Sequence, residues 1–447
     1  MKKHWLLYLL LLVGLTQACS DDDSFTASRS AMLTFSVDTL KLDTVFSTVG
    51  SATYTFWVFN NASDGLRLSS VRLQQGNQTG FRVNVDGTYL DNSLGSVVTD
   101  LEIRKGDSIR VFVELTAAEN GQLTPQKISD DLVFQLESGV VQRVNLCGYT
   151  WDALPLRQLR VKRDTMITSD KPIVVYGGIR VDSAATLTLQ NSTLFFHADA
   201  GIDVYGKLLS NHVVMRGDRL DYMFDYLPYD RISGQWKGIH FFSSSTGNAI
   251  FDTEIRNAMT GILCDSARFS KDDYRLYMEQ CIVHNCKGAG IQAYQSTLGL
   301  LACQITNTLD DCLAVYGGLV ILESCTVAQF YPFSANCGVA LRFGNQKDGK
   351  SYPLEGLVCR KSIITGYDAD VVMGEAGDTA VAFGYYFEKS LLRTPMVNDS
   401  ILFKDVVWES PKDSIQGKQH FVLIDEKNYR YDFHLDSLST AKGMGCY

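Results

Sequence analysis

The sequence lacks the patterns that mark several common functional classes. Its net charge is −9, and no basic run with interleaved aromatic residues is present to follow a phosphate backbone. No Cys-x-x-Cys pair or Cys/His group has the spacing of a metal site, and the seven histidines form no close pair. The GxSxG, HExxH and phosphate-loop motifs are also missing. We therefore expect no nucleic-acid partner, no bound metal and no cofactor.

Long apolar runs are equally scarce, and the one clear case lies at the N-terminus. Lys2 and Lys3 precede an apolar stretch from Trp5 to Leu15, which is too short for a stable membrane span and is typical of a signal peptide. It ends in Leu-Thr-Gln-Ala-Cys, which resembles a bacterial lipobox. The resemblance implies cleavage after residue 18 and lipidation of Cys19, so that the membrane becomes a partner through the lipid.

An acidic tether follows the predicted lipidation site. Residues 20–23 read Ser-Asp-Asp-Asp, which resembles the surface-export signal of Bacteroidota-type lipoproteins. The resemblance implies an outer-membrane lipoprotein on the cell surface, with residues 19–30 as its tether. The alternative is an acidic stretch that is merely solvated.

Residues 31–147 contain seven or eight short segments of alternating polarity, such as YTFWVF and SIRVFVEL, separated by Asn, Asp and Gly turns. This pattern predicts an antiparallel β-sandwich. It resembles the immunoglobulin-like domains that often follow a lipid anchor, although no Cys…Trp…Cys pattern is present. The expected role is a spacer, and a binding role would require an exposed aromatic patch. We predict that residues 148–172, with a basic stretch at 157–163, form a linker.

The middle of the chain repeats at a step of 22 residues. LYMEQCIVHN, LGLLACQITN and VILESCTVAQ align so that Val283, Ile305 and Val327 share one column. Apolar residues recur two apart and β-branched residues are common, which indicates strands stacked as a parallel β-helix. The same register places Leu194, Ile255 and Ile364 in that column. We predict a right-handed parallel β-helix over residues 173–380, so that the whole chain is all-β.

Two further columns accompany the repeat. Cys281, Cys303 and Cys325 align, and we interpret them as buried free thiols, with a disulfide between coils as the alternative. The second column is made of amides, at Asn257, Asn285, Asn307 and Gln329, and resembles the asparagine ladders of pectate-lyase-like β-helices. We expect these amides to point inward and bond to one another or to turn backbones. Residues 381–447 are predicted to form C-terminal coils and a cap over the last coil.

The period is interrupted between Met215 and Gly238 by an insertion rich in aromatic and charged residues. Aromatic rings stack on sugars, and guanidinium groups bond to hydroxyls and acids. The alternative is that the rings cover the core and the charges pair with each other. The candidate ligand-binding residues are Tyr222, Phe224, Tyr226, Tyr229, Arg231 and Trp236.

A second candidate is the pair Asp310 and Asp311, in the segment TLDDCLAV. It is similar to the GDDC segment of polygalacturonase-like glycoside hydrolases, in which paired carboxylates protonate the leaving oxygen and activate water. However, Leu309 replaces the glycine, and no Gly-His-Gly follows. These two residues are therefore weak catalytic candidates.

The insertion and the following SSSTGNAIFDTEIRNAMTGI together resemble a group of β-helix lipoproteins of the Bacteroidota. The resemblance implies a fold and a cellular address but no reaction. We expect a lipid-anchored cell-envelope protein that binds glycan or has a structural or adhesive role. The alternative is a polysaccharide-degrading hydrolase or lyase on the same fold, and the fold alone does not separate the two.

Overall fold

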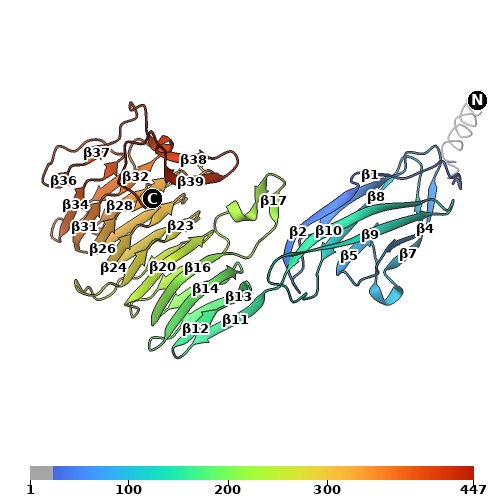
Figure 1. Cartoon of the computed structure of the whole chain (residues 1–447), viewed down its shortest axis with the longest axis horizontal. Helices are drawn as coiled ribbons and strands as arrows, with labels where there is room; N and C mark the ends of the chain where they lie inside the picture. The colour runs from blue at the N-terminus through green and yellow to red at the C-terminus, as the bar shows by residue number, and fades with distance from the viewer. Residues whose placement is uncertain (1–23) are drawn as a thin grey trace, which may run out of the picture. The chain divides into compact units, whose positions relative to one another are not determined.

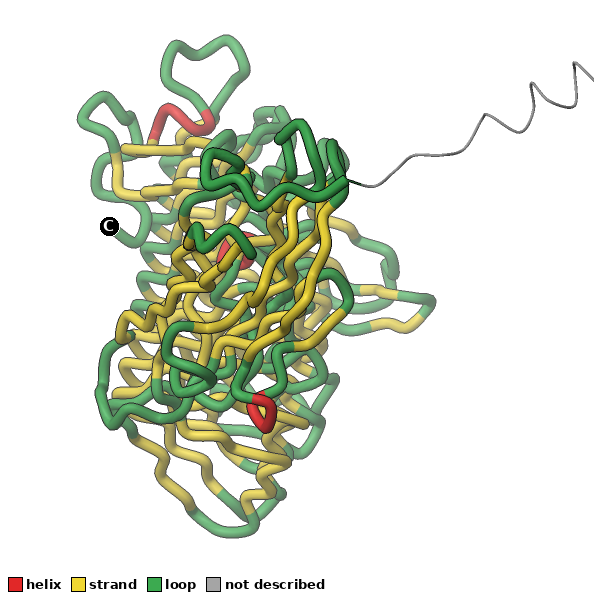
Figure 2. Tube along the Cα trace, turned by 90° about the vertical axis from the view of Figure 1, so that its right-hand side faces the viewer, coloured by secondary structure: helices red, strands yellow, loops and turns green. Residues whose placement is uncertain are grey.

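The computed structural model describes residues 24–447. The predicted signal peptide, Cys19 and the start of the tether lie outside the described residues. The chain divides into two compact units with a boundary between Asp152 and Ala153. Strands dominate both units, and the helical content of the described residues is confined to short 3₁₀ turns (Figure 2).

The first unit consists of two five-stranded sheets around one core. Burial alternates along its strands, so that Phe56, Val83 and Val111 of one sheet and Leu132 and Leu146 of the other point into that core. One sheet has the order β1 (Thr34–Phe35), β3 (Tyr54–Phe59), β8 (Ser108–Leu115), β5 (Phe81–Val85), β6 (Thr88–Tyr89); the other has the order β2 (Thr39–Phe46), β10 (Val141–Trp151), β9 (Gln126–Leu136), β4 (Leu66–Leu73), β7 (Val97–Ile103). A 3₁₀ turn, η1 (Asn92–Leu94), precedes β7.

The second unit is a parallel solenoid in which each strand pairs with strands one coil away (Figure 1). Its strands, in chain order, are β11 (Leu154–Val161), β12 (Thr165–Thr168), β13 (Ile173–Val181), β14 (Thr186–Phe196), β15 (Ile202–Val204), β16 (Lys207–Gly217), β19 (Ile239–Phe241), β20 (Asn248–Arg256), β21 (Ile262–Cys264), β22 (Leu276–Glu279), β23 (Ile282–His284), β24 (Ile291–Leu301), β25 (Gln304–Thr306), β26 (Leu313–Glu323), β27 (Thr326–Gln329), β28 (Leu341–Gly344), β31 (Leu354–Arg360), β32 (Ile363–Gly366), β33 (Val372–Glu375), β34 (Phe383–Glu388), β35 (Leu391–Leu392), β36 (Phe403–Lys404) and β37 (Val407–Trp408).

The register predicted from the 22-residue repeat is confirmed. Val283 pairs with Ile305, Ile305 with Val327, and Val327 with Ile364. Towards the N-terminus the same column continues through Ile255, Met215 and Leu194. All of these side chains are fully buried, which is why a single apolar residue at each of these positions specifies the stacking.

The amide column is buried as expected, but its asparagines are required partly by the backbone conformation and not only by their side-chain hydrogen bonds. Asn257, Asn285 and Asn307 have φ values of 63°, 55° and 57°, so each turns the chain in the left-handed region that asparagine tolerates well. Their described side-chain bonds go to backbone groups; for example, the Oδ1 atom of Asn307 accepts from the Phe330 N–H at 3.1 Å. The cysteines at 281, 303 and 325 are free and buried.

The solenoid begins earlier than predicted. Residues 148–172 were expected to form a linker, but β10 continues to Trp151, and β11 starts at Leu154 and pairs with β13. Leu156 and Leu159 pack against the solenoid core, so this segment is the first coil. Two prolines and several basic residues hid its short apolar alternation.

The C-terminal segment, residues 417–447, lies along one flank of the solenoid and packs against several coils there, including Leu391 and Val407 of the last strands. It contains η3 (Gly417–His420) and the hairpin β38 (Phe421–Asp425) and β39 (Arg430–Leu435). Phe421 and Phe433 bury the outward-facing Ala328 and Ile363. The OH group of Tyr447 reaches the Oε1 atom of Gln304 at 3.1 Å. The predicted end cap is therefore a side cover, here called the flank segment.

A buried ionic network fixes the flank segment. The Glu409 carboxylate accepts from the Thr365 hydroxyl at 2.8 Å and the Gly417 N–H at 2.5 Å, and it pairs with Arg393. His420 lies 3.3 Å away and bonds to Ser439 through its other ring nitrogen. Burial raises the pKa of Glu409, but these hydrogen bonds together outweigh it, so the net shift is downward.

Candidate functional site

The insertion forms a projecting hairpin, β17 (Tyr222–Phe224) and β18 (Leu227–Pro228), followed by the turn η2 (Tyr229–Arg231) (Figure 1). Tyr222, Phe224 and Tyr226 are 49%, 55% and 70% exposed. The rings of Phe224 and Tyr226 stack with centroids 5.6 Å apart. Three of the six predicted ligand residues therefore form an exposed aromatic tip, defined here as Tyr222, Phe224 and Tyr226.

The base of the insertion is fixed by charge and by an amide. Asp230 pairs with Arg216 at 2.8 Å and with Arg256 at 3.2 Å. Burial lowers the pKa of Arg216 to about 10, although Asp230 acts in the opposite direction. The Nδ2 atom of Asn257 donates to the carbonyls of Asp230 and Ile232 at 2.9 and 3.0 Å. The insertion is thus attached through the amide column of the next coil.

Trp236 is not a ligand residue, and its prediction was wrong. Its side chain is fully buried, stacks on Phe196 at 4.2 Å, and donates from Nε1 to the Arg256 carbonyl at 2.8 Å. It belongs to the solenoid core because the chain re-enters the regular coil at this position. The aromatic signal in the sequence does not distinguish a ring that binds a ligand from one that anchors a loop.

Tyr229 and Arg231 are half-buried and support the insertion. The Arg219 guanidinium lies 3.9 Å from the centre of the Tyr229 ring. Arg231 approaches Asp230, and the positive charges of Arg231 and Arg256 both act on the half-buried His284. Burial, with the help of these two cations, lowers the pKa of His284 to about 3, so this imidazole is neutral at physiological pH.

Asp310 and Asp311 lie in an open groove of about 640 Å³ between the loop after β27 and a small hairpin. The hairpin consists of β29 (Gln346–Lys347) and β30 (Lys350–Ser351). The groove is lined by Ala289, Gln292, Leu309, Asp310, Asp311, Ala314, Tyr316, Asn336, Cys337, Gly338, Arg342 and Lys347.

The two aspartates of the groove play different parts. Asp311 accepts from the Nε atom of Arg342 at 2.7 Å and from the Val339 N–H at 2.9 Å, and only 13% of its side chain is exposed. The hydrogen bond to Asp311 in turn raises the pKa of Arg342. Asp310 is exposed, and its carboxylate faces the groove without such a clamp. The pair therefore does not resemble a matched acid and base.

Tyr316 lines one wall of the groove, and Tyr294 and Tyr352 pack around its largely buried ring. Tyr294 pairs in register with Tyr316, and their rings stack 5.5 Å apart. Tyr352 lies against Tyr294, and the ammonium group of Lys347 lies 5.2 Å from the Tyr316 ring centre. Burial raises the pKa of Tyr316, so its phenol remains a neutral donor. This wall was missed, although Tyr294 and Tyr316 lie 22 residues apart and extend the repeat already recognised.

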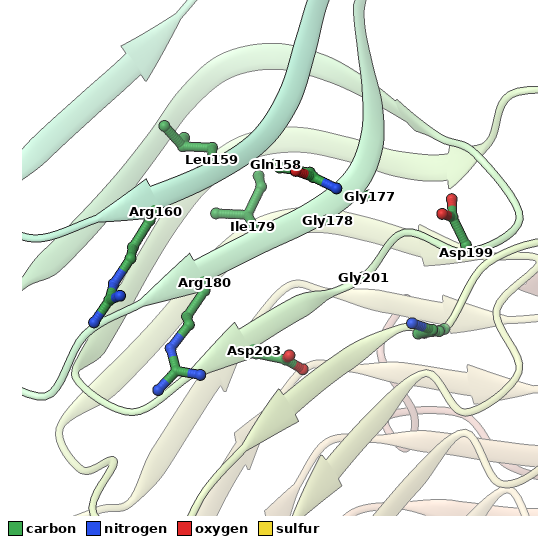
Figure 3. A pocket seen from close by; sticks show the side chains of 11 residues that line it. Gln158, Leu159, Arg160, Gly177, Gly178, Ile179, Arg180, Asp199, Gly201 and Asp203 are labelled. Carbon is green, nitrogen blue, oxygen red and sulfur yellow. The ribbon is translucent and has the colours of Figure 1, made fainter.

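A smaller cavity of about 270 Å³ lies on the first coils, beside Arg160, Arg180 and Asp203 (Figure 3). The guanidinium groups of Arg160 and Arg180 both approach Asp182, at 3.0 and 3.5 Å. Arg180 also stacks on the Tyr205 ring at 4.3 Å. Because Asp182 and Tyr205 already occupy the two guanidinium groups, the groove beside Tyr316 is the stronger candidate.

Across residues 24–447, no group of three His, Cys, Asp or Glu residues is placed to hold a metal ion. Within the same range, no helix has the length and apolar character needed to cross a membrane.

A family model described as a right-handed β-helix region matches residues 169–331. The match supports a right-handed solenoid. It covers the insertion as well as Tyr294 and Tyr316 beside the groove. A search of curated proteins found no match.

Several solved structures show weak likeness. The Agl-KA catalytic domain aligns over 81% of this chain and 74% of its own length, with 11% identity and a TM-score of 0.25. A family 123 glycoside hydrolase from Clostridium perfringens aligns over 27% of this chain and 26% of its own, with 8% identity and a TM-score of 0.18. A PapD-like domain of human CEP192 aligns over 30% and 94%, with 11% identity and a TM-score of 0.19. Likeness at these TM-scores carries no argument.

Proposed function

We propose that this chain is a lipid-anchored envelope protein, displayed on the outer face of the outer membrane, whose β-helix binds glycan. An immunoglobulin-like sandwich would separate the β-helix from the anchor. The observation that supports the binding role is the groove, which Tyr316 and the apolar Leu309 line together with amide, carboxylate and ammonium groups. Sugars present hydroxyls around a ring with apolar faces, and such a lining matches both kinds of surface.

Each polar group of the groove has a role in this proposal. The Asp310 carboxylate accepts hydrogen bonds from sugar hydroxyls, whereas Lys347 donates to ring or hydroxyl oxygens. Gln292 and Asn336 supply amides, which both donate and accept. A volume of about 640 Å³ accommodates a short stretch of a saccharide chain. Opposite charges at separate points favour a neutral or mixed glycan over a uniformly charged one.

Binding is favoured over hydrolysis by the contact between Asp311 and Arg342. A glycoside hydrolase needs one carboxyl group that holds a proton and a second about 5 to 9.5 Å away. The Asp311 carboxylate is instead held in direct contact with the Arg342 guanidinium. A hydrolase would then have to work with Asp310 alone in this groove. Release of reducing ends from any bound glycan, lost in Asp310→Asn, would instead support the enzyme.

Binding at the groove is tested with the double variant Asp310→Asn, Lys347→Ala against a glycan array and by calorimetry. We expect at least a tenfold loss of affinity for the best wild-type ligand, which corresponds to about 1.4 kcal/mol. The control is Asp272→Asn, which repeats the Asp310→Asn substitution at an exposed position that does not line the groove. Equal binding by all three proteins, or by none, would contradict the proposal.

The anchor is tested separately. Cys19→Ala is expected to abolish lipid labelling and release the protein from the membrane fraction, because a multiply acylated cysteine supplies about 0.8 kcal/mol per buried methylene. Protease treatment of intact cells then reports display on the outer face. Membrane association that persists in Cys19→Ala would argue against the lipid anchor without affecting the groove.

A further inference from the structure

The sandwich has an outer surface that a simple spacer does not need. In the sheet containing β3, β8 and β5, the inward residues fill the core and the alternate residues point outward. Trp57 is 41% exposed there, and Tyr89 on the neighbouring β6 is 46% exposed. We define the Trp57 face by its outward residues Thr55, Trp57, Phe59, Arg82, Asn84, Tyr89, Arg110, Phe112 and Glu114.

The strand register brings the aromatic and cationic groups of this face together. Trp57 lies opposite Arg110, and Phe112 lies opposite Asn84. The Arg110 guanidinium is 5.4 Å from the Trp57 ring centre and 4.9 Å from the Phe112 ring centre. It also donates to the Thr55 hydroxyl at 3.3 Å. A cation held between two partly exposed rings is a preorganised recognition element.

The opposite sheet of the same sandwich provides an internal comparison. Its outward side is mainly polar, with exposed Lys127, Ser129 and Gln135 on β9. Arg67 pairs with Glu102 at 2.8 Å on the same side. This is the expected surface of a sheet that has one face in water. That side also carries one exposed ring, Tyr149, so the Trp57 face differs in placing a single cation between two rings.

We propose that the Trp57 face binds an acidic polysaccharide, with sugar rings lying on Trp57 and Phe112 and a sugar carboxylate bound by Arg110. The charge of the face supports an acidic ligand. Among the outward residues of β3, β5 and β8 there are two arginines, Arg82 and Arg110, and one carboxylate, Glu114. This local excess of positive charge contrasts with the net charge of −9 for the whole chain.

The shape of the face favours a saccharide over a peptide. Extended peptides are usually bound by adding a strand to a sheet edge or by filling a groove. The Trp57 face is the flat side of a sheet, and the edge strands β1 and β6 have only two residues each. Flat sugar rings need neither an edge nor a groove, because they stack directly on aromatic rings. This site is independent of the groove beside Tyr316.

The test uses the purified protein with the groove disabled by Asp310→Asn and Lys347→Ala, so that the remaining binding reports the Trp57 face. Polygalacturonate, alginate and hyaluronate serve as acidic probes, and methyl-esterified polygalacturonate serves as the uncharged counterpart. We expect binding to at least one acidic polymer that weakens with salt. Trp57→Ala should lower that affinity about tenfold, and Arg110→Gln should remove most of the preference for the acidic over the esterified polymer.

The control is Tyr149→Ala, which removes an equally exposed ring from the other sheet and should leave affinity unchanged. No binding to any of the three acidic polymers, or binding by both Trp57→Ala and Arg110→Gln that equals that of the parent protein, overturns the proposal. It is also overturned if the wild type sediments as a dimer that Trp57→Ala converts to a monomer, because the face would then join two copies. Arg110→Gln keeps the test valid if Trp57→Ala fails to fold.

Discussion

The insertion and the groove hold their aromatic residues in opposite ways. The insertion places Tyr222, Phe224 and Tyr226 on a hairpin that projects from the coils, whereas the groove is lined by Tyr316, which is stacked on Tyr294 of the neighbouring strand. The hairpin is conspicuous in the sequence because it breaks the period. The wall is inconspicuous because it obeys the period. The comparison teaches that the irregular insertion is attached by its most conspicuous residue, Trp236, while the regular strands supply the side chain that lines the open groove.

The largest expected effect is a loss of stability when Trp236, which attaches the insertion to the core, is replaced. Trp236→Ala should reduce the free energy of unfolding by about 3–5 kcal/mol, since it removes a fully buried ring and its hydrogen bond. Tyr226→Ala, at a ring that is 70% exposed, should change it by less than about 0.5 kcal/mol. Urea denaturation checks both values. Similar losses in the two variants would mean that the insertion is not attached as described.

The next largest effect is expected in acid, which should destabilise the coils beneath the flank segment before the coils that carry the insertion. The folded pKa of Glu409 lies below its unfolded value, so its stabilisation is complete above the usual glutamate pKa of about 4.3 and is lost as the pH falls through the folded pKa. The flank segment covers the face formed by β27 and β32, near the groove. Hydrogen exchange at pH 7 and pH 3.5 should therefore show earlier loss of protection in residues 326–392 than in residues 194–256. The reverse order would contradict the role of Glu409.

A smaller effect is expected where the amide column holds the insertion. Asn257→Ala removes two hydrogen bonds and places alanine at a φ of 63°, with a combined cost of about 1–3 kcal/mol. Asn257→Gly keeps the backbone conformation accessible and loses only the bonds. Limited proteolysis should cut both variants faster between residues 222 and 226. Cleavage at the wild-type rate in both would show that the insertion is held by its ion pairs alone.

The smallest effect on stability, but the sharpest on function, comes from the aromatic tip. Tyr222→Ala with Phe224→Ala should leave unfolding nearly unchanged, because both rings are about half exposed. If the tip extends the glycan-binding surface of the groove, affinity should fall about threefold to tenfold in calorimetry. Unchanged affinity would confine binding to the groove beside Tyr316.

The sequence was sufficient to predict the fold at positions of the 22-residue repeat, where the role of a residue follows from the matching residues of the neighbouring repeats. Ile305 and its column predicted the stacking correctly, since each position requires one buried apolar side chain. The part played by Asn257 was only half predictable: its burial follows from the register, but its left-handed backbone and its bonds to Ile232 depend on an insertion 25 residues away.

The candidate site was less predictable, because it depends on distant contacts. Asp311 appeared similar to a catalytic residue until Arg342, 31 residues later, was found to neutralise it. Trp236 was predicted to bind a ligand because it belongs to an insertion rich in aromatic and charged residues, and its burial depends on Phe196 in the preceding coil. The groove needed two loops of different coils to approach one another, and no local pattern encodes that approach.

The free cysteines have a practical consequence for every unfolding measurement. Ten described cysteines are unbonded and seven of them are buried, and burial raises the pKa of Cys264, Cys286, Cys312 and Cys359 to about 12. The native fold therefore shields these thiols from oxidants and from exchange. Once the chain opens, they regain ordinary reactivity, and wrongly paired disulfides can form faster than refolding. Heating in air should be irreversible, and a reductant should restore reversibility.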